Sequence, residues 1–455
     1  MKKKKKVKLK IKKQVVFNLI SIVFVLTVGF YFLGRLIYYK IDSQKEFVFS
    51  KQLAQRLIEE EEQNIYESEN SLVHVNGIYR YVGDAKYNYV EYKGLLWRVV
   101  KINADNSVTL ITQDNVISLA YGDSVEHHIL TWLNDKDQAN TGIFQTSLEE
   151  KKENLKTTKI CTDSFNELEI ASCFETNENY KIGLLSVYDY LEANANESYL
   201  NNGSIFWTSN KFDTENSWYV AEDGRISYDD SKSKLGIRPV ITLDGDTLIY
   251  SGNGTVDNPY SLNEKNPETL EEAYIGKYLL YNDTLWKIVS KEKDKIKIVS
   301  EECLKGNDGN CITRKYSDYS NKIDLNGNEL MAYLNNTYYN SLKEKDFLTH
   351  GKFYTGTYSL MDNNYRSSLE ESEDLKVGFL AVGEIFAFEI ENTFLMTTSP
   401  NNDLSIYSVN NLHSLYQNTV TEELNIRPSL YLKASIKIQG GDGSYLSPYQ
   451  LGGNK

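Results

Sequence analysis

The chain has 455 residues, enough for two or three domains, and its 41% hydrophobic and 25% charged residues indicate that most of it folds. The net charge is −13, although residues 1–13 alone carry nine lysines and no acidic residue. Without these nine of the 50 Lys and Arg, 41 basic side chains face 63 acidic ones. An acidic body repels phosphate backbones, which argues against nucleic acid as a partner.

The next segment, 14–38, is predicted to be a transmembrane signal anchor. Its apolar run from Val15 to Leu33 would span about 28 Å as a helix, close to the roughly 30 Å of a bilayer core. The preceding lysines, the basic tail 1–13, place the N-terminus in the cytoplasm. No Ala-x-Ala-like site follows, so a cleaved signal peptide is the alternative. We expect a single-pass protein of the cell membrane, with extracellular C-terminal domains.

The region 39–71 is predicted to be a short stalk. It is rich in helix formers between Gln52 and Glu62 and has no Gly or Pro there. A solvated helix beside the membrane is the expected form, and the segment is too short to show the heptads of a coiled coil.

The rest of the chain contains an internal repeat. Leu-Gly-Ile-Arg-Pro at 235–239 returns as Leu-Asn-Ile-Arg-Pro at 424–428, and Leu-Trp-Arg-Val-Val at 96–100 returns as Leu-Trp-Lys-Ile-Val at 285–289. Both pairs are 189 residues apart, and a register shared by both ends of a unit indicates a duplicated domain. The predicted domains are a first repeat at 72–263, a linker at 264–273 and a second repeat at 274–455.

Periodicity and turn signals predict the elements of the first repeat. A hairpin is expected around the Asn-Ala-Asp-Asn turn at 103–106, and another around Asp223-Gly224. The capping-box pattern from Ser186 to Asp189 predicts the start of a helix. The predicted strands are 78–82, 89–92, 95–102, 108–112 and, after the Arg-Pro step, 240–243.

The order of the motifs resembles a known family. Trp-Arg-Val-Val at 97–100, Ile-Gly-Leu-Leu at 182–185, Gly-Ile-Arg-Pro-Val at 236–240 and a closing Gly-x-Gly-Thr-x3-Pro-Tyr-x-Leu at 252–262 occur in sequence. This resembles bacterial cell-surface domains related to the formylglycine-generating-enzyme branch of C-type-lectin-like folds, in two tandem copies. The resemblance implies an α+β fold class, in which the transmembrane helix and helical stalk precede two C-type-lectin-like mixed domains.

Four cysteines suggest an oxidising compartment. Cys161 and Cys173 fall in the first repeat, and Cys303 and Cys311 fall in the second. Three connectivities are possible, and proximity favours one disulfide in each repeat. Free thiols are the alternative, whereas the spacing does not match a zinc site.

The residues offer no catalytic constellation. Formylglycine-generating enzymes use two copper-binding cysteines near the C-terminal end. Each repeat has a Thr-Ser dipeptide in this region, at 208–209 and at 398–399, and no cysteine follows either of them within its repeat. The related iron enzymes need a histidine cluster, but the five histidines lack suitable spacing. We therefore predict no catalytic residues, no cofactor and no metal site, and leave calcium binding open.

Two arginines that recur in both repeats and several aromatic residues are candidates for ligand binding. Arg238 and Arg427 precede a strand-starting proline in both repeats, and we expect them to pair with a buried acid rather than to clamp a ligand. The aromatic residues could present rings to a ligand, with half-buried packing as the alternative. These candidate ligand-binding residues are Trp207, Trp218, Tyr219, Tyr338 and Tyr339.

The sequence thus predicts a membrane-anchored extracellular binding or adhesion protein with duplicated, non-catalytic domains. Its ligand would be an extracellular glycan or protein. A structural or regulatory partner protein of the cell envelope is the alternative, and a metal- or thiol-dependent enzyme is a third class.

Overall fold

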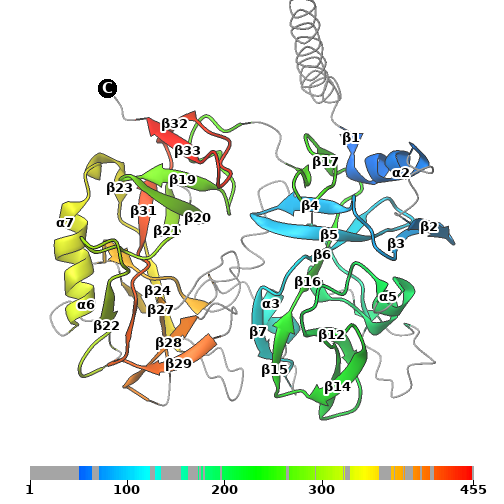
Figure 1. Cartoon of the computed structure of the whole chain (residues 1–455), viewed down its shortest axis with the longest axis horizontal. Coiled ribbons are helices and arrows are strands. Elements are labelled where there is room, and N and C mark those ends of the chain that lie inside the picture. Colours follow the sequence, from blue (N-terminus) through cyan, green and yellow to red (C-terminus); the bar gives the residue numbers. More distant parts are fainter. Residues whose placement is uncertain are drawn as a thin grey trace, which may run out of the picture. The chain divides into compact units, whose positions relative to one another are not determined.

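The fold is known from a computed structural model, shown in Figure 1. It describes residues 51–452 except for 64–70, 123–128, 135–154, 162–172, 174–175, 178–179, 195–196, 263–265, 293, 321, 323–327, 358–369, 373–374, 383, 385–392, 400–401 and 410–414.

The predicted fold class is wrong. Of the described residues, 44% lie in strands and only 13% in helices, so the protein is mostly β and not the α+β protein with lectin-like mixed domains that we expected. No helix within the described ranges is long and apolar enough to cross a membrane. The predicted spanning segment 14–38 lies outside these ranges, and the structure lends it no support.

The predicted stalk contributes to the folded body instead of standing in solvent. Its helix α2, Leu53–Gln63, buries Leu53, Ala54 and Leu57 in the hydrophobic core of the first repeat. The strand just before it, β1 (Lys51–Gln52), pairs antiparallel with β17 (Leu248–Ile249). This apolar face explains why the segment packs, because burying it removes its surface from water.

Two sheets build the first repeat. The larger follows the order β11-β16-β6-β5-β3-β2, with β4, β8 and β18 at its margins, and the smaller follows β14-β13-β12-β15-β7. The strands of the larger sheet are β2 Ser71–Val75, β3 Ile78–Val82, β4 Tyr89–Tyr92, β5 Leu95–Ile102, β6 Val108–Thr112, β8 Leu155–Lys156, β11 Ile182–Leu184, β16 Pro239–Leu243 and β18 Tyr260–Ser261. The smaller sheet has β7 Ile117–Ala120, β12 Phe206–Lys211, β13 Asn216–Val220, β14 Ile226–Asp230 and β15 Lys234–Ile237.

Within the described residues, the first repeat also contains a small ribbon and, besides α2, the helices α3 and α5. The ribbon pairs β9 (Ile160–Cys161) with β10 (Thr176–Asn177). The helices are α3 (Ile129–Asn134) and α5 (Val187–Glu192).

The second repeat has the same plan. Its first sheet follows β23-β31-β21-β20-β19-β33-β32, with β26 beside β31, and its second follows β22-β30-β27-β24-β25, with β28 and β29 beyond β27. The first-sheet strands are β19 Tyr278–Tyr281, β20 Thr284–Glu292, β21 Lys295–Ser300, β23 Leu348–Thr349, β26 Val377–Gly378, β31 Ser429–Lys433, β32 Lys437–Gly440 and β33 Tyr449–Gly452. The others are β22 Thr313–Lys315, β24 Phe353–Thr357, β25 Glu370–Ser372, β27 Thr393–Thr398, β28 Ser405–Val409, β29 Leu415–Thr419 and β30 Glu423–Asn425.

The helices of the second repeat are short. They are α6 Glu329–Ala332, the π-helix η4 Tyr333–Tyr338, α7 Tyr339–Ser341 and the 3-10 helix η5 Lys345–Phe347.

Strand register carries the repeat into three dimensions. Val90 faces Trp97 across β4 and β5, and Leu279 faces Trp286 across β19 and β20. The ladders β5–β6 and β20–β21 each contain an irregularity at the same place, directly after Val99 and after Ile288. Pairing partners can therefore be used to match positions of the two repeats where the sequence spacing changes. The domain boundaries given above stay predictions.

The repeated tryptophans belong to the cores. Trp97 and Trp286 are fully buried. Their Nε1 atoms donate to the carbonyl oxygens of Tyr92 and Tyr281 at 2.9 and 3.0 Å, which satisfies the buried N–H in both repeats.

Candidate functional site

The tryptophans proposed for a binding surface lie in the interior. Trp207 in β12 has no exposed surface, and its Nε1 donates to the carbonyl oxygen of Leu119 at 3.0 Å. Trp218 in β13 is 4% exposed, and the ring of Tyr219 packs edge-on against Trp207 with centroids 6.1 Å apart. Burial leaves Trp207 and Trp218 no ring face to offer a ligand.

Tyr338 and Tyr339 are half-buried where η4 meets α7, and both pack against the hydrophobic cores of the second repeat. Burial raises the pKa of Tyr338. The ring of Tyr339 lies 4.6 Å from the ammonium of Lys376. A ligand-binding role for these tyrosines stays a prediction.

The two predicted disulfides are present. Cys161 pairs with Cys173 and Cys303 with Cys311, and their Cα atoms are 5.5 and 5.6 Å apart. Cys161 is buried in β9 and lines a cavity of the first repeat.

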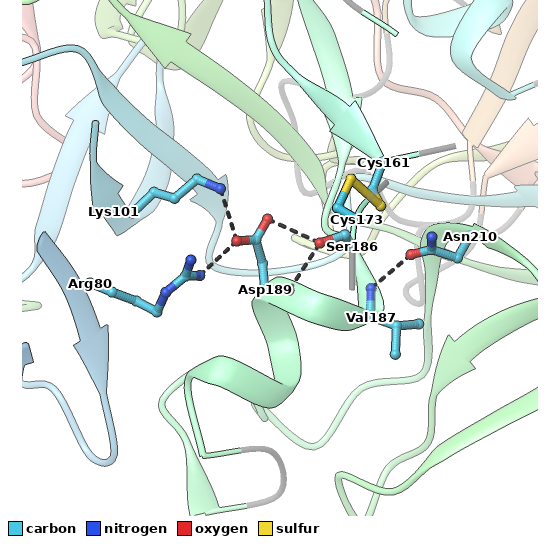
Figure 2. The surroundings of a disulfide bond; sticks show 8 residues. All are labelled: Arg80, Lys101, Cys161, Cys173, Ser186, Val187, Asp189 and Asn210. Atoms are coloured by element: carbon cyan, nitrogen blue, oxygen red, sulfur yellow. Dashed lines mark hydrogen bonds and ion pairs between the residues drawn. A yellow bond between two sulfur atoms is a disulfide. The ribbon is translucent and has the colours of Figure 1, made fainter. Parts of the chain in front are cut away.

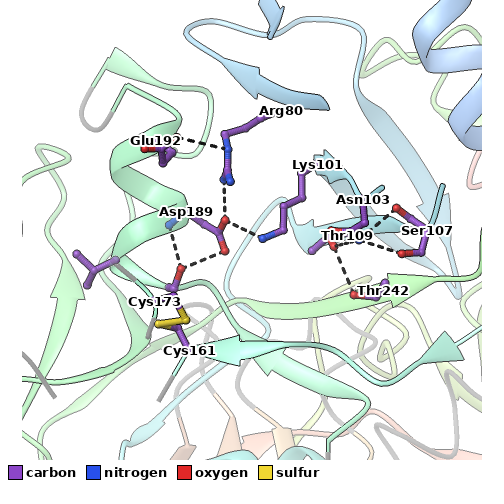
Figure 3. Close-up of polar contacts among 12 residues, drawn as sticks. Arg80, Lys101, Asn103, Ser107, Thr109, Cys161, Cys173, Asp189, Glu192 and Thr242 are labelled. Carbon is purple, nitrogen blue, oxygen red and sulfur yellow. Dashed lines mark hydrogen bonds and ion pairs between the residues drawn. A yellow bond between two sulfur atoms is a disulfide. The ribbon is translucent and has the colours of Figure 1, made fainter. Parts of the chain in front are cut away.

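This cavity is the candidate site. It has a volume of about 580 Å³ and lies where β5, β6, β8 and β16 meet the start of α5 (Figure 3). Its lining combines apolar side chains, among them Ile78, Leu184 and Val240, with polar and charged ones. The polar and charged residues are Lys101, Asn103, Asp105, Ser107, Thr109, Lys156, Thr157, Thr158, Lys159, Ser186, Asp189 and Thr242.

A capped helix forms one wall. The hydroxyl of Ser186 accepts from the backbone N–H of Asp189 at 2.9 Å and donates to its carboxylate at 3.0 Å (Figure 2). The side-chain oxygen of Asn210 accepts from the backbone N–H of Val187, which has no partner within the helix, at 2.9 Å. The capping pattern read from the sequence is therefore present, and it fixes Asp189 at the edge of the cavity.

Asp189 is held as a carboxylate. Arg80 from β3 donates to it at 2.6 Å and Lys101 from β5 at 2.8 Å (Figure 2). Burial opposes the charged form, but the attraction of Lys101 and Arg80 outweighs it and holds the pKa of Asp189 well below its usual range. Asp189 is consequently an acceptor of hydrogen bonds and not a proton donor.

Threonine hydroxyls line the floor. Thr109 in β6 accepts from Asn103 Nδ2 at 3.2 Å, and its Oγ1 lies 3.4 Å from that of Thr242 in β16. Thr158 donates to the carbonyl oxygen of Lys181 at 2.7 Å and lies 3.3 Å from Thr242. These long contacts leave the Thr109 and Thr242 hydroxyls able to exchange partners with a ligand.

The rim is charged and exposed to solvent. Lys156 in β8 pairs with Asp105 at 2.7 Å, and both side chains are exposed. Hydrogen bonds from Lys156 and from the Ser107 hydroxyl lower the pKa of Asp105. Such a pair is screened by solvent and can open at little cost.

The second repeat fills the equivalent space. Thr242 faces Thr109 across β16 and β6, and at the same ladder position Tyr431 faces Lys297 across β31 and β21. Two threonines thus stand where the second repeat has a lysine and a tyrosine. The ammonium of Lys297 lies 5.6 Å from the centre of the Tyr431 ring and 5.0 Å from that of Phe353.

The acidic residue is present in both repeats, but its cation changes. Gly183 of β11 and Gly378 of β26 pair with matching positions of β16 and β31. Asp189 and Glu384 each follow their glycine by six residues. Glu384 is bound by Lys297 at 2.7 and 2.8 Å, and neither side chain is exposed. In the second repeat a lysine at the position of Thr109 therefore binds the acidic residue, whereas in the first repeat Arg80 and Lys101 do so.

Sequence reasoning missed this site. The two threonines belong to no motif, and the signal lies only in their comparison with Lys297 and Tyr431. The alignment of Thr109 with Lys297 departs by one residue from the 189 spacing, because seven residues separate Lys101 from its partner Thr109 and only six separate Ser290 from its partner Lys297.

The cavity presents many hydrogen-bonding groups. It offers hydroxyls, a fixed carboxylate and lysine ammonium groups. Among the described residues, no group of three or more His, Cys, Asp or Glu could hold a metal ion. No protein-family model, curated protein or solved structure matches the chain.

Proposed function

We propose that the protein is a binding protein of an oxidising compartment outside the cytoplasm, and that its first repeat binds a hydroxyl-rich ligand, such as a sugar residue of a glycan. The observation that carries the proposal is the pair Thr109 and Thr242 at the floor of an open cavity, where the second repeat has the space-filling Lys297 and Tyr431.

The lining supports a sugar. Neighbouring hydroxyl groups of a sugar each donate and accept, so they match a wall of alternating donors and acceptors. Asp189 accepts, the lysine ammonium groups donate, and the threonine hydroxyls do both. Two disulfides support an oxidising compartment, because such bonds persist outside the reducing cytoplasm.

The test places the two larger side chains of the second repeat, lysine and tyrosine, at the equivalent positions of the first. Full-length wild-type protein is screened on an array of neutral and N-acetylated oligosaccharides, and any hit is titrated by calorimetry. In the double variant Thr109→Lys and Thr242→Tyr, we expect sugar binding to fall at least tenfold. Because Asp189 is already bound by Arg80 and Lys101, binding is compared only after the melting temperature has shown that the variant folds.

The matched control places the same two residue types on exposed threonines of the second repeat, as Thr313→Lys and Thr421→Tyr. Sugar binding should be unchanged in this control. The proposal fails if wild-type protein binds no oligosaccharide on the array, or if the cavity-filling variant binds as tightly as wild type.

A further inference from the structure

A second cavity of the first repeat contains an unbalanced buried charge. The argument starts from Arg238 and Arg427, which are equivalent residues and are both buried. Their Nε atoms donate to the carbonyl oxygens of Thr112 and Ser300 at 2.9 and 3.0 Å. The Nε anchoring of the two guanidinium groups is therefore the same, whereas Nη1 of Arg238 donates to the carbonyl oxygen of Leu200 and Nη2 of Arg427 to that of Glu301.

Their acidic partners differ. Arg427 Nη2 lies 3.7 Å from the carboxylate of Glu301, as expected from the sequence for both arginines. Glu301 and Gln113 are equivalent, because their backbone N–H groups donate to Leu285 and Leu96 across matching strand pairs. The first repeat thus has a neutral amide where the second has a carboxylate, and the expectation of a buried acid is wrong for Arg238.

The consequence is visible at Arg238 itself. It has no exposed surface, and only Nε and Nη1 have partners, the latter donating to the Leu200 carbonyl oxygen at 2.6 Å. Its Nη2 is buried without a hydrogen-bond partner. Five N–H donors of a guanidinium normally find acceptors when buried, so this group is undersatisfied.

A second buried guanidinium lies close enough to act on the first. Arg98 in β5 is 3% exposed and lies under the ring of Tyr89, 3.8 Å from its centre. It donates to Asn88 at 2.7 Å, to the Tyr89 hydroxyl at 2.9 Å and to Gln113 Oε1 at 3.2 Å, and also to the carbonyl oxygen of Ala85. Four of its five N–H groups are used.

Neither guanidinium has a counter-ion among the described residues, since no carboxylate lies within ion-pair distance of Arg98 or Arg238. Burial lowers the pKa of Arg98. Burial and the charge of Arg98 lower the pKa of Arg238 to about 10, although the exposed carboxylate of Asp114 acts to raise it. Both remain charged at neutral pH, and an unpaired buried charge is costly.

Arg98 and Gln113 line a cavity of about 590 Å³, which is separate from the threonine-floored one. Besides these two, Tyr89, Ser198, Asn201 and Asn202 contribute polar atoms. The charged groups at its rim are Asp84, Lys86 and Glu197, and all three are exposed to solvent. Asp84 pairs with Lys86 at 3.8 Å, and solvent screening limits how far any of the three balances the buried charge.

We propose that this second cavity binds the carboxylate of a small organic acid. The ligand carboxylate would pair with Arg98, beside Gln113, which stands where the second repeat has Glu301. Gln113 turns its carbonyl oxygen towards Arg98, which leaves its amide nitrogen for the ligand. The remaining N–H of Arg98 supplies a charge-assisted bond. A sugar acid and the C-terminus of a peptide share this chemistry.

The probes are D-glucuronate and N-acetyl-L-alanine, with D-glucose and N-acetyl-L-alanine amide as neutral counterparts. Binding to full-length wild-type protein is followed by calorimetry and by the melting temperature. We expect at least one acid to bind at least tenfold more tightly than its neutral counterpart, and more weakly as sodium chloride is raised. Binding of glucuronate alone would identify a sugar acid, and binding of N-acetyl-L-alanine alone a peptide terminus.

The variant Gln113→Glu supplies an internal carboxylate, as in the second repeat. It should raise the melting temperature and weaken binding of the acid at least tenfold. Gln417→Glu makes the same charge change on the exposed surface of β29 and should leave both unchanged. The proposal is overturned if neither acid binds, if the neutral probes bind equally well, or if Gln113→Glu binds the acid as wild type does.

Discussion

The buried ion pair of the second repeat gives the sharpest stability prediction. Lys297 and Glu384 have no exposed side-chain surface and are 2.7 Å apart, so the small value typical of surface pairs does not apply. Replacing Lys297 by Met leaves the Glu384 charge buried without its cation. We expect a loss of about 3–5 kcal/mol in the free energy of unfolding. At about 2–4 °C per kcal/mol, this lowers the melting temperature of that transition by roughly 6–20 °C.

The double variant Lys297→Met with Glu384→Gln separates charge from packing. Gln keeps an amide oxygen for the Ala381 N–H, which Glu384 accepts at 2.8 Å, while no buried charge remains. We expect most of the lost stability to return, as in other buried pairs replaced together. Calorimetric melting of wild type, both single variants and the double variant measures the coupling. A single variant within 1 °C of wild type, or a double variant with the summed loss of both singles, would refute the reasoning.

Three further predictions concern the first repeat. The pKa of Asp189 is lowered in the folded state, so its ion pairs stabilise the protein above the unfolded pKa of about 4, and this stabilisation is lost as the pH falls. In urea unfolding from pH 6 to 2, the free energy of unfolding should therefore decrease less in Asp189→Asn than in wild type. Replacing Cys161 and Cys173 by Ser should cost about 2–3 kcal/mol and weaken sugar binding, whereas removal of the other disulfide should spare binding in the same calorimetric assay. Trp207→Ala should cost about 3–5 kcal/mol in chemical denaturation, because its ring is core, and Tyr445→Ala on the exposed surface should change little.

The sequence predicted local pairing well where turn chemistry decides it. The hairpin of β5 and β6 turns at 103–106, and Val220 faces Ile226 across the Asp223-Gly224 turn, as expected. The α+β class failed for a different reason. The signals for helices were real but short, and α5 spans only Val187–Glu192 before the chain returns to strands.

Side-chain equivalence between the repeats could not be read from sequence alone. Spacing in the sequence aligns the Thr-Ser steps at 208–209 and 398–399, yet the ladders show Trp207 facing Tyr219 and Phe394 facing Ser408 at the matching position, 187 residues apart. The cavity threonines were hidden by a similar change of spacing, because the connection from Ser290 to Lys297 is one residue shorter than that from Lys101 to Thr109.

The way each repeat closes has a mechanical consequence. In the first repeat β18 runs parallel to β4, with Tyr260 beside Val90, and in the second β33 runs parallel to β19, with Tyr449 beside Leu279. When the N-terminal end of the first strand and the C-terminal end of the second strand of such a pair are pulled apart, the two forces act along the strands in opposite directions. Its hydrogen bonds are then loaded together in shear and cannot be opened one at a time, which lets a short pair resist force.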